Sequence, residues 1–302
     1  MSPDRAMPVL VYRNPCCAQD SHPRCQYAGG TNVKLIGVGA EGCAAVGAVQ
    51  QVGSTMIDEF LYLEPVSPAA STTLLSARST SLAEAVQGAD LAVMIARRET
   101  VEDADRARLA LRQAQSAGRL VVEIGLSASA GESPAFSDAT DHVPWSATQE
   151  AESPIRIRIS TCEGVAASAS LVIRCIRTLT EILNEGLIGT DFDDIKSAVR
   201  GARVCGFGWG HGAGANRGRI AAIQALAHTA LTSLVRNGCA AGLIVTIEGG
   251  IQTLKMRDYK LVMDALLPTL MAGGRFACNT VRRTDLPDDA VEVGLIVATL
   301  AG

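Results

Sequence analysis

Residues 32–52 read NVKLIGVGAEGCAAVGAVQQV, and this stretch decides the fold class of the chain. Its first part, residues 32–38, is a short, mostly apolar run of the kind found in buried strands of parallel sheets. The glycines at positions 39 and 42 then favour a tight turn, and the small and apolar residues 43–52 favour a closely packed helix. The stretch therefore predicts a strand, a glycine turn and a helix in direct succession.

The same alternation continues downstream. Apolar runs predict further strands at 60–63, 90–96 and 120–124, and helical patterns lie between them at 82–87 and 102–117. Strands that alternate with helices favour a mostly parallel sheet with helices on both faces. The first half of the chain is therefore predicted to be an α/β domain of the Rossmann-like type.

The second half has a different pattern. A loop-like stretch at 127–154 precedes a predicted strand at 155–159 and a helix at 163–184, which is long enough to bridge two domains. Beyond it the patterns predict an α+β domain, with helices at 193–199, 216–235 and 256–270 and strands at 204–210, 242–247, 274–280 and 291–300. We expect a flexible arm at 1–31, a nucleotide-binding-like domain with the central helix at 32–185, and a C-terminal domain at 186–302.

Composition excludes several classes of protein. The chain has 302 residues, 48% of them hydrophobic, a net charge of −4 and a pI of about 5.6. This balance gives no basic surface for nucleic acid or an anionic membrane. No apolar run approaches the roughly 18 residues of a membrane span, and the patch Val9-Leu10-Val11 is too short for a secretory signal. We expect a cytoplasmic protein with no nucleic-acid or membrane partner.

The nine cysteines are scattered, and most lie in apolar runs, which indicates buried, reduced thiols. One group differs, because Cys16, Cys17, His22 and Cys25 lie together in a polar, proline-containing segment. Four such side chains are potential zinc ligands, but their spacing matches no standard zinc motif. We favour an unstructured arm over a metal site and predict no metal.

The glycines of the first turn have a possible role in ligand binding. A strand that leads through glycines into a helix directs backbone N–H groups and the positive helix end at phosphate oxygens, and Gly37, Gly39 and Gly42 are placed to do this. The alternative is a tight strand-to-helix turn without a ligand. A third interpretation is a dinucleotide site, since Glu64 follows about 20 residues on, where an acid would bind a ribose.

Several separated segments, taken in order, resemble FtsZ of the tubulin/FtsZ superfamily from about residue 32 to the end. Residues 34–46 (KLIGVGAEGCAAV) are similar to its first phosphate loop, and residues 90–96 to the strand before its glycine-rich signature loop. The most specific matches are 186–199 (GLIGTDFDDIKSAV), similar to the inter-domain loop, and 202–218 (ARVCGFGWGHGAGANRG), similar to the segment ending in Glu-Asn-Arg. Residues 291–302 resemble the last strand.

The resemblance implies a GTPase that assembles head to tail. It implies that Gly37, Gly39, Gly42 and Cys43 form the phosphate loop for GTP or GDP. It also implies that Asp191 and Asp194 reach the nucleotide of the next subunit and orient the attacking water, while Gly189 replaces an asparagine of the family pattern. The alternative for these two acids is a capping role, in which Asp191 caps the helix that begins near Asp193.

This chain departs from the family pattern where the phosphates would bind. The signature loop Gly-Gly-Gly-Thr-Gly-Thr-Gly aligns with residues 99–105, ETVEDAD, which contain four carboxylates and no glycine. Glu41 adds a carboxylate to the first loop, and Ala44 and Ala169 replace the asparagine and the base-reading aspartate. Arg97 and Arg98 would offset the acids in part if they point inward. The resemblance therefore implies a degenerate site, with GTPase activity lost or very weak.

The remaining candidates have structural interpretations. We expect His211 to be a surface turn residue, His228 to be a satisfied residue of an apolar helix, and Trp209 to pack or to mark an interface. Asn216 and Arg217 match the Glu-Asn-Arg turn and are expected to brace the fold.

The leading hypothesis is a bacterial FtsZ-like cytoskeletal protein of the cell-division type. It would be a pseudo-GTPase without a nucleotide cofactor that forms filaments with itself or binds and regulates a tubulin/FtsZ-like partner. The alternatives are an active GTP-hydrolysing filament protein, which would use GTP or GDP, and an NAD(P)-binding Rossmann-type enzyme.

Overall fold

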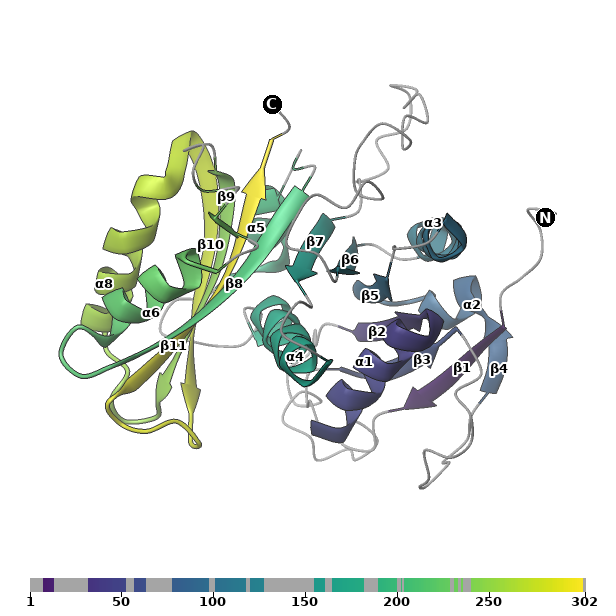
Figure 1. Cartoon of the computed structure of the whole chain (residues 1–302), viewed down its shortest axis with the longest axis horizontal. Coiled ribbons are helices and arrows are strands. Elements are labelled where there is room, and N and C mark those ends of the chain that lie inside the picture. Colours follow the sequence, from purple (N-terminus) through teal and green to yellow (C-terminus); the bar gives the residue numbers. More distant parts are fainter. Residues whose placement is uncertain are drawn as a thin grey trace. The chain divides into compact units, whose positions relative to one another are not determined.

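A computed structural model describes residues 8–13, 32–52, 57–63, 78–97, 101–117, 120–127, 155–160, 165–181, 190–199, 202, 204–228, 231–232, 235 and 240–300. The chain divides into two compact units, Met1–Pro154 and Ile155–Gly302. Figure 1 shows the elements of both units. Each unit is described by itself.

The first unit contains a six-stranded sheet in the order β6-β5-β2-β3-β1-β4. Four of its strands run parallel to one another: β2 (Val33–Val38), β3 (Glu59–Tyr62), β5 (Leu91–Arg97) and β6 (Leu120–Ser127). Nearly every side chain of β2 and β5 is buried, as their apolar sequences predict. The predicted parallel α/β architecture of this half is confirmed.

One strand lies where the sequence predicts an arm. β1 (Pro8–Arg13) pairs antiparallel with β3, with Leu10 opposite Tyr62, and with β4 (Arg78–Ser81) on its other side. Val9 is 1% exposed and packs into the core of this unit. The flexible arm was therefore the wrong expectation for residues 8–13, because the patch Val9-Leu10-Val11 supplies apolar side chains that the sheet buries.

Helices cover both faces of this sheet, as the doubly wound pattern requires. Helix α1 (Gly39–Val52) packs on β2, β3 and β5, and Val46 and Val49 are buried there. Helices α2 (Leu82–Val86) and α3 (Val101–Ala117) contribute to a separate apolar core that includes Met94 of β5. Ser81 and Glu84 form a capping box that starts α2 directly after β4.

The second unit has a five-stranded mixed sheet in the order β10-β9-β11-β8-β7. Strand β11 (Ala290–Thr299) lies between β8 (Val204–Ala213) and β9 (Ala240–Gly250) and runs antiparallel to both. The flanking strands β7 (Ile155–Ser160) and β10 (Leu270–Arg283) are parallel to β8 and β9. Mixed pairing agrees with the α+β domain that the sequence predicts.

Helices α6 (Arg217–Leu226) and α8 (Met256–Leu266) lie on one face of this sheet, and η4 (Leu267–Thr269) follows α8 (Figure 1). The close approach of α6 explains the alternating glycines of β8. A Cβ on Gly208, Gly210 or Gly212 would lie 2.0–2.2 Å from a backbone oxygen of α6. Only glycine fits at these three positions, because the helix backbone rests directly on the strand.

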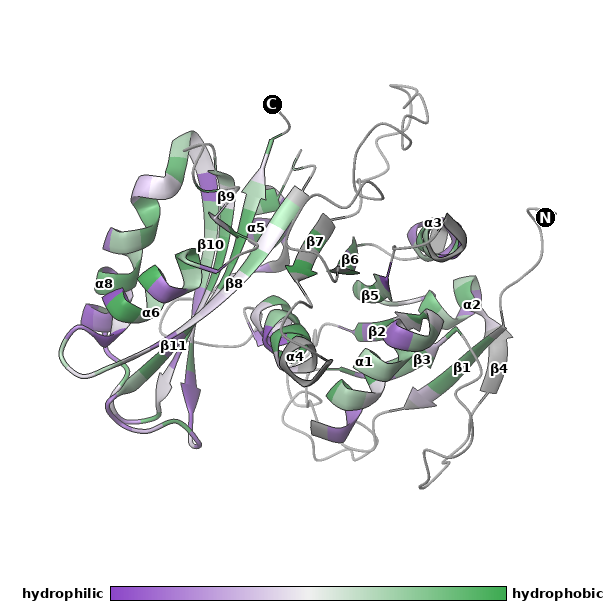
Figure 2. Ribbon diagram, in the orientation of Figure 1, coloured by the Kyte–Doolittle hydropathy of each residue, from purple (hydrophilic) through white to green (hydrophobic). Residues whose placement is uncertain are grey.

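Helices α4 (Val165–Glu181) and α5 (Phe192–Val199) lie on the opposite face of the second sheet. Polar contacts from α4 reach the even-numbered residues of β9, whereas Leu243, Val245 and Ile247 face the α6–α8 core. Figure 2 shows the resulting pattern, with hydrophobic strands and hydrophilic ends on β10 and β11. The domain boundary after residue 185 and the bridging role of the central helix stay predictions.

Candidate functional site: the carboxyl edge of β2 and β5

The first sheet has a topological switch point between β2 and β5. From β2 the chain moves to β3 on one side and then returns to β5 on the other side. In open α/β sheets, ligands bind beyond the carboxyl ends of the strands at such a point. Here α1 begins directly after β2, so the positive end of that helix lies at the switch point.

The three predicted loop glycines lie together at this edge, and packing explains two of them. A Cβ on Gly42 would lie 2.3 Å from the Ile95 oxygen, and one on Gly37 would lie 2.7 Å from the Cys43 Cα. Gly39 instead has a φ of +74°, which favours glycine, and no atom within 4 Å of its would-be Cβ. The predicted strand and helix are confirmed, but the predicted turn at 39–42 is wrong, because α1 begins at Gly39 directly after β2 and includes Gly42. Phosphate binding at these glycines stays a prediction.

Cys43 is part of the packing beneath the start of α1. It is 5% exposed, and its Sγ lies 3.4 Å from the Gly37 carbonyl oxygen, to which it donates. This contact holds the start of α1 against the end of β2. The predicted role of Cys43 in ligand binding stays a prediction, and any contact with a ligand would have to come from its backbone.

An ion pair spans the switch point. Glu41, in the first turn of α1, accepts a hydrogen bond from the guanidinium of Arg97, the last residue of β5. The carboxylate thus stands at a helix N-terminus, where the helix dipole favours a negative charge, and has a cation as its partner. A ligand phosphate would use the same two stabilising features.

The second helix at this edge also begins with acids. Helix α3 starts at Val101, so Glu102 and Asp103, which align with the glycine-rich signature loop, occupy its first turn. Ala104 is buried, and the exposed Asp105 forms an ion pair with Arg108. Among the described side chains, a carboxylate of the chain itself, Glu41, therefore stands at the N-terminus of α1.

The structure brings Asp191 and Asp194 together as a cap of α5. The Asp194 N–H donates to the Asp191 Oδ1 at 2.8 Å, and the Asp191 N–H donates to the Asp194 Oδ2 at 3.2 Å. This reciprocal arrangement is a capping box, so the capping interpretation is confirmed. Both residues are exposed, and their predicted action on a neighbouring nucleotide stays a prediction.

Arg217 braces the second unit, as the sequence predicts. Its guanidinium binds both carboxylate oxygens of Asp258 at 2.8 and 2.9 Å and donates to the carbonyls of Thr253 and Asp288. Burial would raise the pKa of Asp258, but the hydrogen bonds from Arg217 and the Lys255 N–H outweigh it and lower that pKa. Asn216 precedes α6 and makes no side-chain cap.

The other candidates differ in outcome. Trp209 packs as predicted, with the Arg174 Cζ 3.5 Å from its ring centroid. His211 is exposed but lies within β8 rather than in a turn, because the strand continues to Ala213. His228 is half-buried and follows α6 in a turn, since that helix ends at Leu226.

Some predictions lie outside the described residues. They include the zinc alternative at Cys16, Cys17, His22 and Cys25, the ribose-binding role of Glu64, and the inward orientation of Arg98. Within the described ranges, no three His, Cys, Asp or Glu side chains are grouped as a metal site would require. The helices of those same ranges include none that is long and apolar enough to cross a bilayer.

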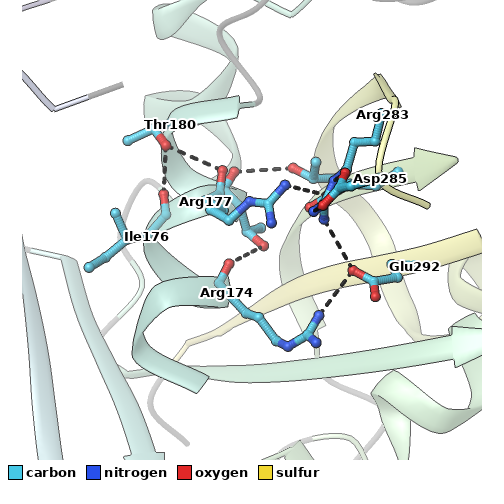
Figure 3. A network of polar contacts seen from close by, with 10 residues as sticks. Arg174, Ile176, Arg177, Thr180, Arg283, Asp285 and Glu292 are labelled. Atoms are coloured by element: carbon cyan, nitrogen blue, oxygen red, sulfur yellow. Dashed lines mark hydrogen bonds and ion pairs between the residues drawn. The ribbon is translucent and has the colours of Figure 1, made fainter. Parts of the chain in front are cut away.

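A network of charges in the second unit was missed at the sequence level. Figure 3 shows arginines of α4 and β10 that meet acids of β9, β11 and the turn after β10. The members are Arg174, Arg177, Glu248, Arg283, Asp285 and Glu292. The available signal was a single acid in each of two otherwise apolar strands, AAGLIVTIEGG and AVEVGLIVAT.

These features define a class of protein: a doubly wound α/β unit whose switch point faces two helix N-termini, followed by a mixed-sheet α+β unit.

Comparison with solved structures identifies the fold. An FtsZ dimer from M. jannaschii matches with a TM-score of 0.68 at 14% identity, covering 89% of this chain and 88% of that one. A tryptophan-to-tyrosine mutant of the same FtsZ gives 0.72 at 14% identity, with 89% and 91% covered. CetZ from Methanosaeta thermophila gives 0.61 at 14% identity, with 90% and 87% covered.

A sequence relative agrees with the structures. Cell division protein FtsZ 2 of Rhizobium meliloti is 37% identical over 79 residues, which are 26% of this chain and 22% of that protein. No protein-family model matches the chain. The chain has the tubulin/FtsZ fold, as its motifs predicted, and a segment of 79 residues is similar in sequence to FtsZ 2.

Proposed function

We propose that this chain is an FtsZ-like cytoskeletal protein that does not use GTP, and that it assembles head to tail with itself or with a tubulin/FtsZ-like partner. In this proposal it acts in the cytoplasm, and it contributes an assembly surface rather than a catalytic site. The observation that carries the proposal is the Glu41–Arg97 ion pair at the switch point between β2 and β5.

The ion pair matters because both of its members are already engaged. Arg97, the cation at the end of β5, has a carboxylate as its partner, so it offers less to an incoming phosphate. Glu41 places a negative charge at the N-terminus of α1. The sequence of α3 also begins with two acids, at positions 102 and 103. Glu41 thus already satisfies the dipole of α1, which would otherwise attract a nucleotide phosphate.

The size of the effect favours loss of nucleotide binding. Two like charges about 4 Å apart repel by roughly 4 kcal/mol at an effective dielectric constant of about 20. A nucleotide phosphate beside one of these acids would face a penalty of that order. A hydrogen bond to a charged group contributes only about 1.5–3 kcal/mol, so one loop amide does not offset it.

Isothermal titration of the full chain with GTP and Mg²⁺ tests the first part of the proposal. We expect no binding at concentrations that saturate the FtsZ of M. jannaschii, which serves as the positive control. Micromolar binding together with phosphate release would refute the pseudo-GTPase assignment and favour the active filament protein.

Assembly is tested separately. The chain is mixed with an FtsZ filament-forming protein in GTP, sedimented, and also imaged alone by negative stain with and without nucleotide. We expect filaments of the chain alone in the absence of nucleotide, or its recovery in the FtsZ pellet. A chain that stays in the supernatant and forms no polymer under every condition would contradict the assembly role.

A further inference from the structure

Two acids of the second sheet are buried on the face that α4 covers. Glu248 of β9 is 6% exposed and Glu292 of β11 is 9% exposed. They lie directly opposite each other in the antiparallel pair of strands. Two neighbouring carboxylates in a buried position repel each other unless cations pair with both of them.

Three arginines supply this pairing in a shared arrangement (Figure 3). The Oε2 atom of Glu248 accepts from Arg177 at 2.8 Å and from Arg283 at 2.7 Å. The Oε2 atom of Glu292 accepts from Arg174 at 3.0 Å and from Arg283 at 3.5 Å. Each acid therefore joins one arginine of α4 to the same arginine of β10.

Further contacts fix α4 along its C-terminal half. The hydroxyl of Thr246 donates to the Thr178 carbonyl at 3.1 Å, and the amide of Asn279 donates to the Glu181 carbonyl at 3.1 Å. Gly294 lies beneath Thr178, where a Cβ would come within 2.0 Å of the threonine hydroxyl. The helix therefore rests on β11 without space between them.

We infer that the paired acids Glu248 and Glu292 clamp α4 in a single register on the second sheet, so that α4 and strands β8–β11 move as one rigid body. Arg174 and Arg177 are separated by about 4.5 Å along the helix axis. A shift of α4 by one helical turn, about 5.4 Å, would therefore bring one of them near the present place of the other and take the second one away from both acids. One of the two buried carboxylates would then lose its arginine of α4 and keep Arg283 alone. No intermediate position keeps both pairs, since the arginines lie three residues apart on one face of the helix.

Hydrogen exchange of the full chain, read by mass spectrometry, tests this clamp. In the unmodified protein we expect the amides of α4 to exchange together with those of β9 and β11, since they open as one unit. Glu248→Gln should make the α4 amides exchange at least tenfold faster relative to the strands. Asp264→Asn is the matched control, because it removes the same charge from an exposed acid of α8 that lies outside the network. It should leave α4 protected.

Arg177→Met is the milder variant if Glu248→Gln does not fold, since Glu248 keeps Arg283 as a partner. This variant should also make the α4 amides exchange faster relative to those of the strands. The clamp is refuted if α4 already exchanges tenfold faster than β9 and β11 in the unmodified protein. It is also refuted if the variants accelerate helix and strands equally, because that result indicates general destabilisation.

Discussion

Replacement of Arg217 by alanine should strongly destabilise the second unit. The substitution removes the guanidinium that donates to both carboxylate oxygens of Asp258. The Asp258 side chain, which is only 7% exposed, then has no arginine to balance its charge. Removal of one member of a buried ion pair costs about 3–5 kcal/mol. That loss is a large fraction of the roughly 5–15 kcal/mol by which a protein of ordinary stability is folded.

Urea denaturation followed by the fluorescence of Trp209 measures this loss, in a background in which Trp145 is replaced by phenylalanine. Trp209 lies in β8, the strand on which α6 packs, and therefore reports the unit that contains Arg217. The control is Arg219→Ala, an exposed arginine on the same helix, which should change stability by less than about 0.5 kcal/mol. The stability of Arg217→Lys should fall between the stabilities of the two alanine variants. Lysine keeps the positive charge but cannot donate two parallel hydrogen bonds to one carboxylate.

The same pair predicts a pH dependence. The pKa of Asp258 is lowered in the folded protein, so its contribution is complete above the ordinary value of 3.8 and is lost as the pH falls through the lowered folded value. The stability difference between the unmodified protein and Arg217→Ala should therefore shrink in acid. If Arg217→Ala is no less stable than Arg219→Ala at neutral pH, or if their difference grows in acid, the bracing role is wrong.

Three further substitutions test the packing. Gly210→Ala should destabilise the second unit by at least about 2 kcal/mol in chemical denaturation, because its Cβ would lie 2.0 Å from the Ala221 oxygen. Gly47→Ala should instead stabilise the protein by about 0.5–1 kcal/mol, because this helical position has open space, and a lower melting temperature would contradict it. Asp191→Ala should cost about 1 kcal/mol through loss of the α5 cap, seen as faster hydrogen exchange in that helix alone.

The candidate site shows where sequence patterns stop being informative. The alignment of 99–105 with a glycine-rich loop indicated excess negative charge, and the structure shows that residues 101–105 of this segment belong to α3. The sequence could not show which residue pairs with Arg97, because its partner Glu41 is 56 residues away along the chain. The pairing depends on β2 and β5 being adjacent, which is a property of the sheet and not of either segment.

The sequence by itself determined most of the strands and helices and their order, the glycines at the start of α1 and the resemblance to FtsZ, and it offered the cap of α5 as one of two alternatives. These features depend on periodicity and on residues a few positions apart, so they can be read locally. Only the tertiary structure placed residues 8–13 in the sheet and brought Arg217 to Asp258. It also showed that the alternating glycines of β8 face α6, and that Glu248 and Glu292 meet arginines of α4. All of these features escaped the sequence analysis for the same physical reason. Each is a contact between segments that are distant along the chain, and it stabilises the protein only after the chain has folded.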